Sequence, residues 1–221
     1  SSPSSDTFEP EASVLSDNSY RNNLQKMERI RTTLGKRSDG NAPKLNLPQM
    51  VVIGDQSAGK SAVMSTLTGV PFPSESGITT KCPAVVHTKH DPSCSDIKFT
   101  MENADRDLKP HTSETLPNAI LTRQRELLAT TDSKVIDTPI VIHAVGCMCN
   151  DLTLVDLPGI ISNGSEEEKE GILTMIRTYI TPVESLILVV TEAKQDEEGA
   201  FAIQLAREVD PDETRTLRIL T

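Results

Sequence analysis

Residues 54–61 read Gly54-Asp55-Gln56-Ser57-Ala58-Gly59-Lys60-Ser61, which matches the phosphate-binding pattern G-x-x-x-x-G-K-[ST]. In such a loop, backbone N–H groups close around a polyphosphate, the lysine brings a positive charge to the outer phosphates, and the serine hydroxyl can ligate Mg²⁺. The pattern alone occurs too often by chance to assign a function. Its weight therefore depends on the sequence around it.

The residues on either side of this loop predict a strand before it and a helix after it. Met50-Val51-Val52-Ile53 is an apolar, β-branched run of the length of a buried strand. Residues 62–68 contain neither Gly nor Pro and are followed by Gly69, which is typical of a helix end. This order points the amino end of the helix toward bound phosphates. The alternative, a plain glycine turn between two core elements, is much the weaker interpretation.

The remaining sequence alternates predicted strands with predicted helices. Apolar runs predict the strands, and apolar residues at helical spacing predict the helices. Strands are expected at residues 84–88, 97–101, 140–145, 152–155, 185–190 and 216–221, and helices at 116–129, 166–180 and 197–209, the last with Phe201, Ile203, Leu205 and Ala206 inside. This alternation predicts an α/β fold, with a mostly parallel sheet, helices on both faces and ligands at the carboxyl ends of the strands.

The N-terminal region differs in composition from the rest. Residues 1–16 are rich in Ser, Asp, Glu and Pro, and we expect a disordered tail. Residues 17–36 predict an amphipathic helix with the apolar stripe Tyr20, Leu24, Met27, Ile30 and Leu34. A linker follows at 38–44, and the main domain is expected at 45–221. Periodicity does not decide whether the stripe packs on this domain or joins a helical bundle.

The composition excludes some classes of function. The chain has 221 residues, enough for one sizeable core, and a net charge of −10 from 32 acidic and 22 basic residues. It contains no Trp, two Tyr and four Phe, so it has few aromatic side chains on which bases could stack. Since it also lacks an excess of basic residues, we expect no nucleic-acid partner. There is no signal-like N-terminus and no apolar run of membrane-spanning length, which predicts a cytoplasmic protein.

The four cysteines are expected to be reduced in such a compartment. Cys147 and Cys149, with His143 nearby, form a C-x-C pair in a strand-like stretch that lacks a second pair of ligands. We therefore do not expect a zinc site.

A second candidate motif for the phosphate site is Asp156-Leu157-Pro158-Gly159, directly after the predicted strand at 152–155. A buried strand would fix the Asp156 carboxylate beside a Mg²⁺ ion carried by the phosphates, and Gly159 can offer its backbone N–H to the terminal phosphate. Such a motif alone is often an ordinary turn. Its pairing with residues 54–61 favours a nucleotide-binding site that includes Asp156 and Gly159.

Three further segments stand beside these two motifs, namely Leu47-Pro48-Gln49, Gly77-Ile78-Thr79-Thr80-Lys81-Cys82-Pro83 and Ala206-Arg207-Glu208-Val209-Asp210-Pro211. Together with the two motifs they resemble the dynamin superfamily of large GTPases. The Gln56-Ser57 pair is far more specific than the loop pattern itself, and Thr-Lys-Cys-Pro is closest to the myxovirus-resistance branch. The resemblance covers residues 17–221 and implies a Ras-like, enlarged GTPase domain of the phosphate-loop NTPase class. It also implies that a helix of a three-helix bundle comes first, which favours the bundle interpretation of residues 17–36.

The resemblance implies roles in nucleotide and metal binding for four of the matching residues. Lys60 contacts the β- and γ-phosphates of GTP. Ser61 and Thr80 are ligands of Mg²⁺, and Asp156 holds the water shell of the ion. The rest of the loop, from Gly54 to Gly59, surrounds the phosphates.

The resemblance also implies a catalytic arrangement. Gln56 orients the attacking water, assisted by backbone groups of Thr80 and Gly77. Ser57 helps bind a monovalent cation, Na⁺ or K⁺, which takes the place of an arginine finger. Asp196 reaches across a dimer of GTPase domains. Phosphoryl transfer depends mainly on positioning and charge neutralisation, so a cation organised by dimerisation is a reasonable substitute.

At the level of the whole protein, the resemblance implies GTP hydrolysis coupled to self-association. It also implies action at membranes or microtubules, through regions outside this sequence, in membrane fission, trafficking or antiviral defence. Family members continue from the strand at 216–221 into Lys-x-Asp, which binds guanine, whereas this sequence ends at Thr221. We therefore expect a truncated domain with poor solubility and weak binding that does not distinguish bases. Two alternatives stay open: a fragment without turnover that binds partners, and a phosphate-loop ATPase.

Overall fold

The computed structural model describes residues 49–73, 82–131, 135–194 and 200–221, and the predicted tail at 1–16 and helix at 17–36 lie outside these ranges. All strands and helices predicted between residues 50 and 221 are present, so the α/β fold is confirmed. The strands are β1 (Gln49–Ile53), β2 (Ala84–His90), β3 (Lys98–Glu102), β4 (Leu108–His111), β5 (Ile140–Gly146), β6 (Leu152–Asp156), β7 (Ser185–Thr191) and β8 (Thr216–Leu220). The helices are α2 (Lys60–Thr68), α3 (Leu116–Ala129), α4 (Glu166–Ile180) and α5 (Phe201–Val209).

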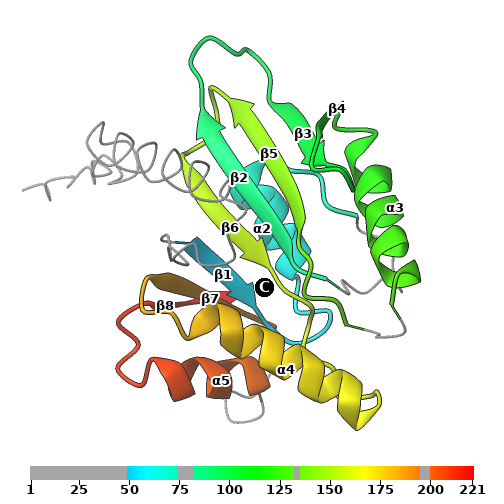
Figure 1. Ribbon diagram of the computed structural model, residues 1–221. Helices are drawn as coiled ribbons and strands as arrows, with labels where there is room; N and C mark the ends of the chain where they lie inside the picture. Colours follow the sequence, from blue (N-terminus) through cyan, green and yellow to red (C-terminus); the bar gives the residue numbers. More distant parts are fainter. Residues whose placement is uncertain (1–48, 74–81, 132–134, 195–199) are drawn as a thin grey trace, which may run out of the picture. The chain divides into compact units, whose positions relative to one another are not determined.

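The described strands form one sheet in the order β4-β3-β5-β2-β6-β1-β7-β8 (Figure 1). Four pairings are parallel, namely β1 with β6, β1 with β7, β7 with β8 and β2 with β5. The three antiparallel pairings join β2 to β6 and β3 to both β4 and β5. Because β6, β1 and β7 run in the same direction, their carboxyl ends meet at one edge, where parallel sheets bind ligands.

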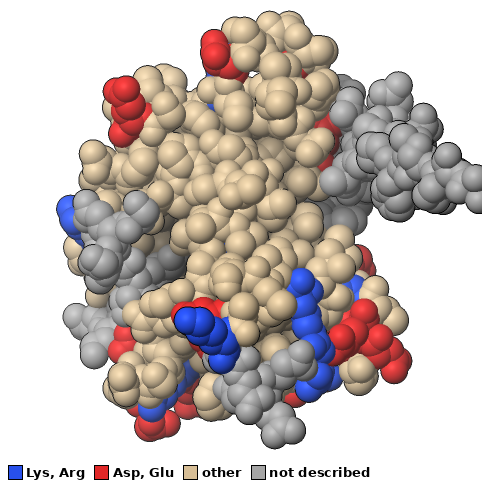
Figure 2. Space-filling view, turned by 180° about the vertical axis from the view of Figure 1, so that it is seen from behind, with Lys and Arg blue, Asp and Glu red and all other residues tan. Residues whose placement is uncertain are grey.

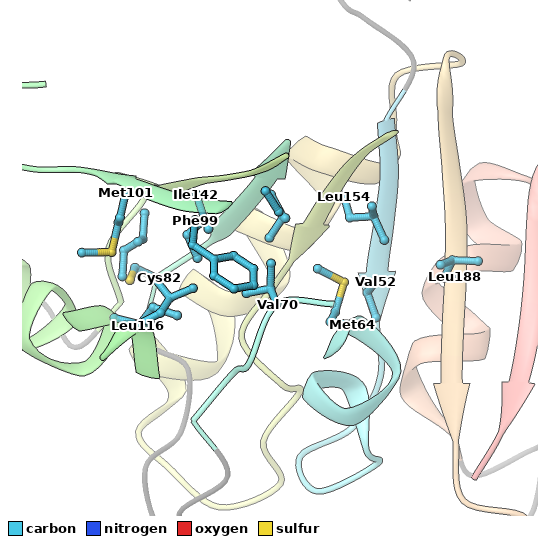
Figure 3. Packing of buried hydrophobic residues seen from close by; sticks show 14 of the residues in the cluster. Val52, Met64, Val70, Cys82, Phe99, Met101, Leu116, Ile142, Leu154 and Leu188 are labelled. Atoms are coloured by element: carbon cyan, nitrogen blue, oxygen red, sulfur yellow. The ribbon is translucent and has the colours of Figure 1, made fainter. Parts of the chain in front are cut away.

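Two cores lie on opposite faces of this sheet, because side chains alternate along each strand. In β1, Val52 points into a core shared with α2 and α3, whereas Val51 and Ile53 point into a core shared with α4 and α5. Figure 3 shows Met64 of α2 beside Val52 and Leu154 in the first of these cores. The central strand that carries the phosphate loop is therefore buried on both faces.

The helix ends follow the signals in the sequence. Helix α2 is closed by Gly69, which adopts a left-handed conformation with φ of 70°. In α4, the Ser165 hydroxyl accepts a hydrogen bond from the Glu168 N–H at 3.2 Å, and three glutamates occupy the first turn, where they interact favourably with the helix dipole.

Strand β4 was not predicted. It contains Pro110, and its side chains are largely exposed, so it shows neither an apolar run nor clear alternation. A proline is tolerated there because β4 is an edge strand, paired on one side only.

The predicted helix at 197–209 was partly wrong. Ala200 is extended and α5 begins at Phe201, and residues 197–199 lie outside the described residues. The Phe201 side chain is 56 % exposed, whereas Ile203, Leu205 and Ala206 are buried as predicted. As the first helical residue, Phe201 lies beyond the buried stripe that begins at Ala202.

The charged side chains are unevenly distributed over the face that Figure 2 shows. Seen from behind, the molecule carries them mainly near the margins of the face, with an uncharged centre (Figure 2). None of the helices in the described ranges is both long and apolar enough to cross a bilayer.

Candidate functional site

The phosphate loop leaves the central strand β1 at the ligand-binding edge and leads directly into α2. Ser57 and Gly59 are left-handed, with φ of 69° and 84°, and the Ala58 N–H donates to the Asp55 carbonyl at 3.2 Å. Turns that contain left-handed residues direct successive backbone N–H groups toward one side and so form an anion-binding concavity. The helix begins at Lys60, two residues earlier than predicted, so its amino end is part of the loop.

Lys60 lies folded into the loop. Its Nζ donates hydrogen bonds to the carbonyl oxygens of Gly54 at 3.0 Å and Asp55 at 2.9 Å, and the residue is 8 % exposed. Burial lowers the pKa of the Lys60 amine, while the neighbouring carboxylates of Asp156 and Asp55 act in the opposite direction. The ammonium group thus lies inside the loop, and the carbonyls of the loop itself accept its hydrogen bonds.

Asp156 ends β6 beside the start of the phosphate loop, because the parallel register pairs it with Val52 of β1. It is 1 % exposed, and burial raises the pKa of its carboxyl to about 6, although Lys60 acts to lower it. Its Oδ1 atom is buried and has no hydrogen-bond partner among the described residues. A buried carboxylate oxygen without a partner, beside a phosphate loop, suits the water shell of a Mg²⁺ ion.

Ser61 and Asp156 both line a small pocket of about 40 Å³ between α2 and α3. Cys82 and Gln124 line it as well, and burial raises the pKa of the Cys82 thiol to about 11, so this thiol is neutral. Gln124 is 7 % exposed and was not among the residues predicted from the sequence. A polar residue one helical turn after Ile120, on the buried side of α3, was the signal that could have revealed it.

The loop after β6 is joined to the phosphate loop by two backbone hydrogen bonds. Ile160 N–H donates to the Gly54 carbonyl at 3.2 Å, and Gln56 N–H donates to the Ile160 carbonyl at 2.9 Å. Gly159 packs so closely that a Cβ atom there would lie 2.8 Å from Lys60 Nζ and 2.9 Å from Gln56 Cα. Gly159 therefore reaches the loop because it has no side chain. The sequence pattern contained no signal for the role of Ile160.

Thr221 contacts the phosphate loop from the other side. Its hydroxyl lies 3.1 Å from the Ala58 carbonyl and 3.3 Å from the Thr191 carbonyl at the end of β7. The loop is thus supported by the segments that follow β6 and β8.

The structure brings together many of the predicted site residues. The loop from Gly54 to Ser61, Asp156 and Gly159 meet at the carboxyl ends of β1 and β6. The side chains of Gln56 and Ser57 are exposed at the outer end of the loop. Thr80, Gly77 and Asp196 lie outside the described residues.

The sequence predicted that Cys147 and Cys149 lie in a strand-like stretch. In the structure they lie instead in a turn that follows β5. Within the described ranges, no group of three or more His, Cys, Asp or Glu side chains is arranged to hold a metal ion.

The contact at Gly159 leads to a direct prediction. We expect Gly159→Ala to lower nucleotide affinity at least about tenfold and to destabilise the fold by about 1–3 kcal/mol, because the new methyl group displaces Lys60 and the loop backbone. Isothermal titration and thermal melting measure the two effects. Gly171→Ala in α4 is the matched control, since a Cβ there meets Val135 at an ordinary 3.7 Å. Unchanged affinity in Gly159→Ala would contradict the tight junction.

Comparisons with known proteins assign the family. A family model described as the Dynamin family matches residues 50–221. Interferon-induced GTP-binding protein Mx2 of Oncorhynchus mykiss is 35 % identical over 210 residues, which cover 91 % of this chain and 33 % of that protein. Putative dynamin-related protein 4A of Arabidopsis thaliana is 37 % identical over 181 residues, covering 80 % and 59 % respectively.

A third relative is interferon-induced GTP-binding protein Mx of Gallus gallus, which is 32 % identical over 209 residues, 93 % of this chain and 29 % of the relative. The chain thus spans about a third of the length of these Mx relatives and 59 % of the plant relative. The match extends over most of the described sheet, including both loops of the site. The chain belongs to the dynamin family.

Proposed function

We propose that this protein binds GTP together with Mg²⁺ at the phosphate loop and hydrolyses it. The observation that carries the proposal is the junction of the two loops, which brings the buried Lys60 ammonium and the unpartnered Oδ1 of Asp156 to the same edge of the sheet. A positive charge and a carboxylate beside a ring of backbone N–H groups are what a metal-bound triphosphate requires. The choice of GTP over ATP rests on family membership and on the names of the relatives.

In this proposal each group of the loop has a distinct task in binding. Lys60 exchanges its two carbonyl partners for oxygens of the β- and γ-phosphates. Ser61 and Thr80 would be the ligands of Mg²⁺ and Asp156 would hold its water shell, and the ion would supply neutralisation of the phosphate charge. Gly159 offers its N–H to the terminal phosphate.

Catalysis is assigned to the exposed end of the loop. Gln56 orients the attacking water together with backbone groups of Thr80 and Gly77, and its own backbone is held by Ile160. Ser57 helps bind a monovalent cation, Na⁺ or K⁺. Because both side chains are exposed, a second molecule has access to this part of the site.

We further propose that the protein self-associates through its GTPase domains, with Asp196 as a contact residue. Analytical ultracentrifugation with and without a transition-state mimic of GTP tests this. A monomer under both conditions would exclude nucleotide-dependent association. Action in the cytoplasm, at membranes or on the cytoskeleton belongs to the same proposal, and rests on family membership alone.

The base preference is tested by competition. In the full-length protein we expect unlabelled GTP to displace a fluorescent GTP analogue in the presence of Mg²⁺, and ATP to displace it at least about tenfold more weakly. A preference for ATP would overturn the assignment of guanine but keep the phosphate site. Failure of either nucleotide to bind would overturn the proposed function as a whole.

The pKa of Asp156 predicts a pH dependence of binding. The carboxylate form is needed near Mg²⁺, and with a pKa of about 6 it is mostly protonated at pH 5. We therefore expect affinity for GTP in the presence of Mg²⁺ to fall about tenfold more between pH 7.5 and 5 in the wild-type protein than in Asp156→Asn. Asp156→Asn has no carboxyl at this position, so its loss of affinity between pH 7.5 and 5 reports the part that comes from titration of the nucleotide itself. Equal slopes in both proteins would contradict the assignment of Asp156.

Without nucleotide, the contribution of Asp156 to the free energy of unfolding should increase as the pH falls, whereas the affinity for GTP should decrease. The folded-state pKa of Asp156 lies above its unfolded value of 3.8, so the folded state binds more protons between these two values. The contribution of Asp156 to the free energy of unfolding therefore increases as the pH falls through about 6. Urea denaturation of the wild type and Asp156→Asn at several pH values isolates this contribution.

A further inference from the structure

Two loops meet at the end of the sheet opposite the phosphate loop. One follows β2 at residues 91–97, the other follows β5 at residues 147–151, and both lie at the upper end of the sheet in Figure 1. Asp91 N–H donates to the Gly146 carbonyl at 3.1 Å, and Cys147 N–H donates to the Cys94 carbonyl at 3.3 Å. These bonds bring two free cysteines onto adjacent backbone segments.

The two loops cross at very close range. A Cβ atom at Gly146 would lie 3.1 Å from the Ile97 Cα atom, so only glycine fits the crossing without displacement of the backbone. At the base of the loops, Asp151 Oδ1 accepts a hydrogen bond from His90 N–H at 2.7 Å, which ties the start of β6 to the end of β2. The arrangement of the cysteines is therefore set by the backbone.

We propose that Cys94 and Cys147 form a reversible disulfide, which makes this end of the sheet a thiol modification site that responds to peroxide. A backbone hydrogen bond between two residues places their Cα atoms within the span that disulfides bridge, about 4.4–6.8 Å. The backbone hydrogen bond fixes the two segments against each other, and we expect rotation of the two side chains to close the bond. In a reducing compartment, disulfides of this kind are transient and sense oxidants.

The surroundings of each thiol assign its part in the reaction. Cys147 is half-buried, and its Sγ lies 3.7 Å from the Ser95 carbonyl, beside Cys94. The Cys94 thiol is buried and donates to Asp91 Oδ2 at 3.5 Å. Cys149 is buried as well, and burial, followed by the charges of Cys147 and Asp151, raises the pKa of its thiol. Cys147 is thus the accessible nucleophile and Cys94 the resolving thiol.

The chemistry is balanced with hydrogen peroxide as the oxidant. The Cys147 thiolate attacks one peroxide oxygen, the O–O bond breaks, and after protonation a sulfenic acid and one water are formed. The Cys94 sulfur then attacks the Cys147 sulfur, the S–OH bond breaks, and the hydroxide leaves as a second water. Two thiols and one peroxide give one disulfide and two waters. A thiol reductant reverses the bond by exchange.

A non-reducing peptide map of the peroxide-treated protein tests the proposal directly. Trypsin places Cys94 in the peptide 90–98, and both Cys147 and Cys149 in the peptide 135–169. We expect these two peptides to appear as one disulfide-linked species, two hydrogen atoms lighter than their sum, that dithiothreitol separates. Cys82, in the peptide 82–89, lies in the core and should stay reduced as an internal control.

Three variants assign the bond. Cys149→Ser is the matched control from the same turn and should still form the linked species. Cys147→Ser should lose it. Cys94→Ser should also lose it, and should accumulate a sulfenic acid on Cys147 that reacts with dimedone. Bound fluorescent GTP analogue is measured in parallel, and oxidation should leave it unchanged because the site lies at the other end of the sheet.

The opposite results overturn the proposal. They are a bond between Cys147 and Cys149, a linked species that survives in Cys147→Ser, or conversion of Cys147 to sulfinic acid while Cys94 stays reduced. Fragmentation of the linked peptides between Cys147 and Cys149 in the mass spectrometer places the bond on one of these two residues in the wild-type protein, so a variant that fails to fold leaves the test of the disulfide intact. The disulfide is also independent of the proposed GTPase function, so either can fail without the other.

Discussion

Lys60→Ala is expected to lower the affinity for GTP by about 10²–10⁴-fold, because it removes two hydrogen bonds from a charged donor to the phosphates, each worth about 1.5–3 kcal/mol. In the structure the Lys60 ammonium donates to the carbonyls of Gly54 and Asp55. Binding is measured by isothermal titration with a slowly hydrolysed GTP analogue in the presence of Mg²⁺. The substitution removes an ammonium group from an already desolvated position, which makes its loss more costly than loss of a surface charge.

A matched control separates this effect from a change of net charge. Lys109→Ala removes the same charge from an exposed position on the edge strand β4 and should leave the affinity unchanged. A second measurement does not need nucleotide: because Lys60 lowers the pKa of Asp156, the carboxyl of Asp156 should titrate above about 6 in Lys60→Ala. Carbon NMR of that carboxyl reports it. If Lys60→Ala binds GTP within about threefold of the wild type, the phosphate role of Lys60 is wrong.

Gln56→Ala is expected to lower kcat by about 10²–10³-fold with little change in KM, as does removal of one positioned hydrogen-bonding group in other enzymes. The loop should keep its shape, since the backbone N–H of Gln56 is bonded to the Ile160 carbonyl at 2.9 Å and this bond does not involve the side chain. Steady-state release of phosphate from GTP measures kcat and KM separately. Gln204→Ala on the exposed side of α5 is the control for loss of a surface glutamine.

Separate changes in kcat and KM distinguish a catalytic role of Gln56 from a structural one. A distorted loop would raise KM, as we expect for Gly159→Ala, whereas a misplaced water lowers kcat alone. Equal loss of affinity in Gln56→Ala and Lys60→Ala would therefore mean that the role assigned to Gln56 is wrong.

Much of the fold could be predicted because local signals and tertiary packing agree. The bounds of α3 and α4 were predicted to the residue, since their apolar residues keep helical spacing. Strand β4 was not predicted, because its position depends on its pairing with β3. The start of α5 was not predicted either, and the exposure of Phe201 depends on where that helix begins.

In the candidate site, too, the residues with local sequence signals were predicted and those placed by tertiary contacts were not. The phosphate loop and Asp156 carry chemical signatures at fixed spacing, so the sequence alone predicted them as parts of one site. Ile160, Gln124 and Thr221 reach the site through backbone geometry or from distant elements, and no spacing rule connects them to the loop. Contacts of this kind become visible only when the strand order is known.

The hydrogen bonds that Lys60 makes to its own loop have a consequence for how fast nucleotide binds. The loop is already closed by its own backbone bonds and by Ile160 and Thr221, so little ordering entropy remains to be lost on association. The Lys60 ammonium has also already shed most of its water. An arriving triphosphate therefore replaces two carbonyl acceptors at a desolvated charge, and the entry step should be set by diffusion and this exchange rather than by rearrangement of the loop.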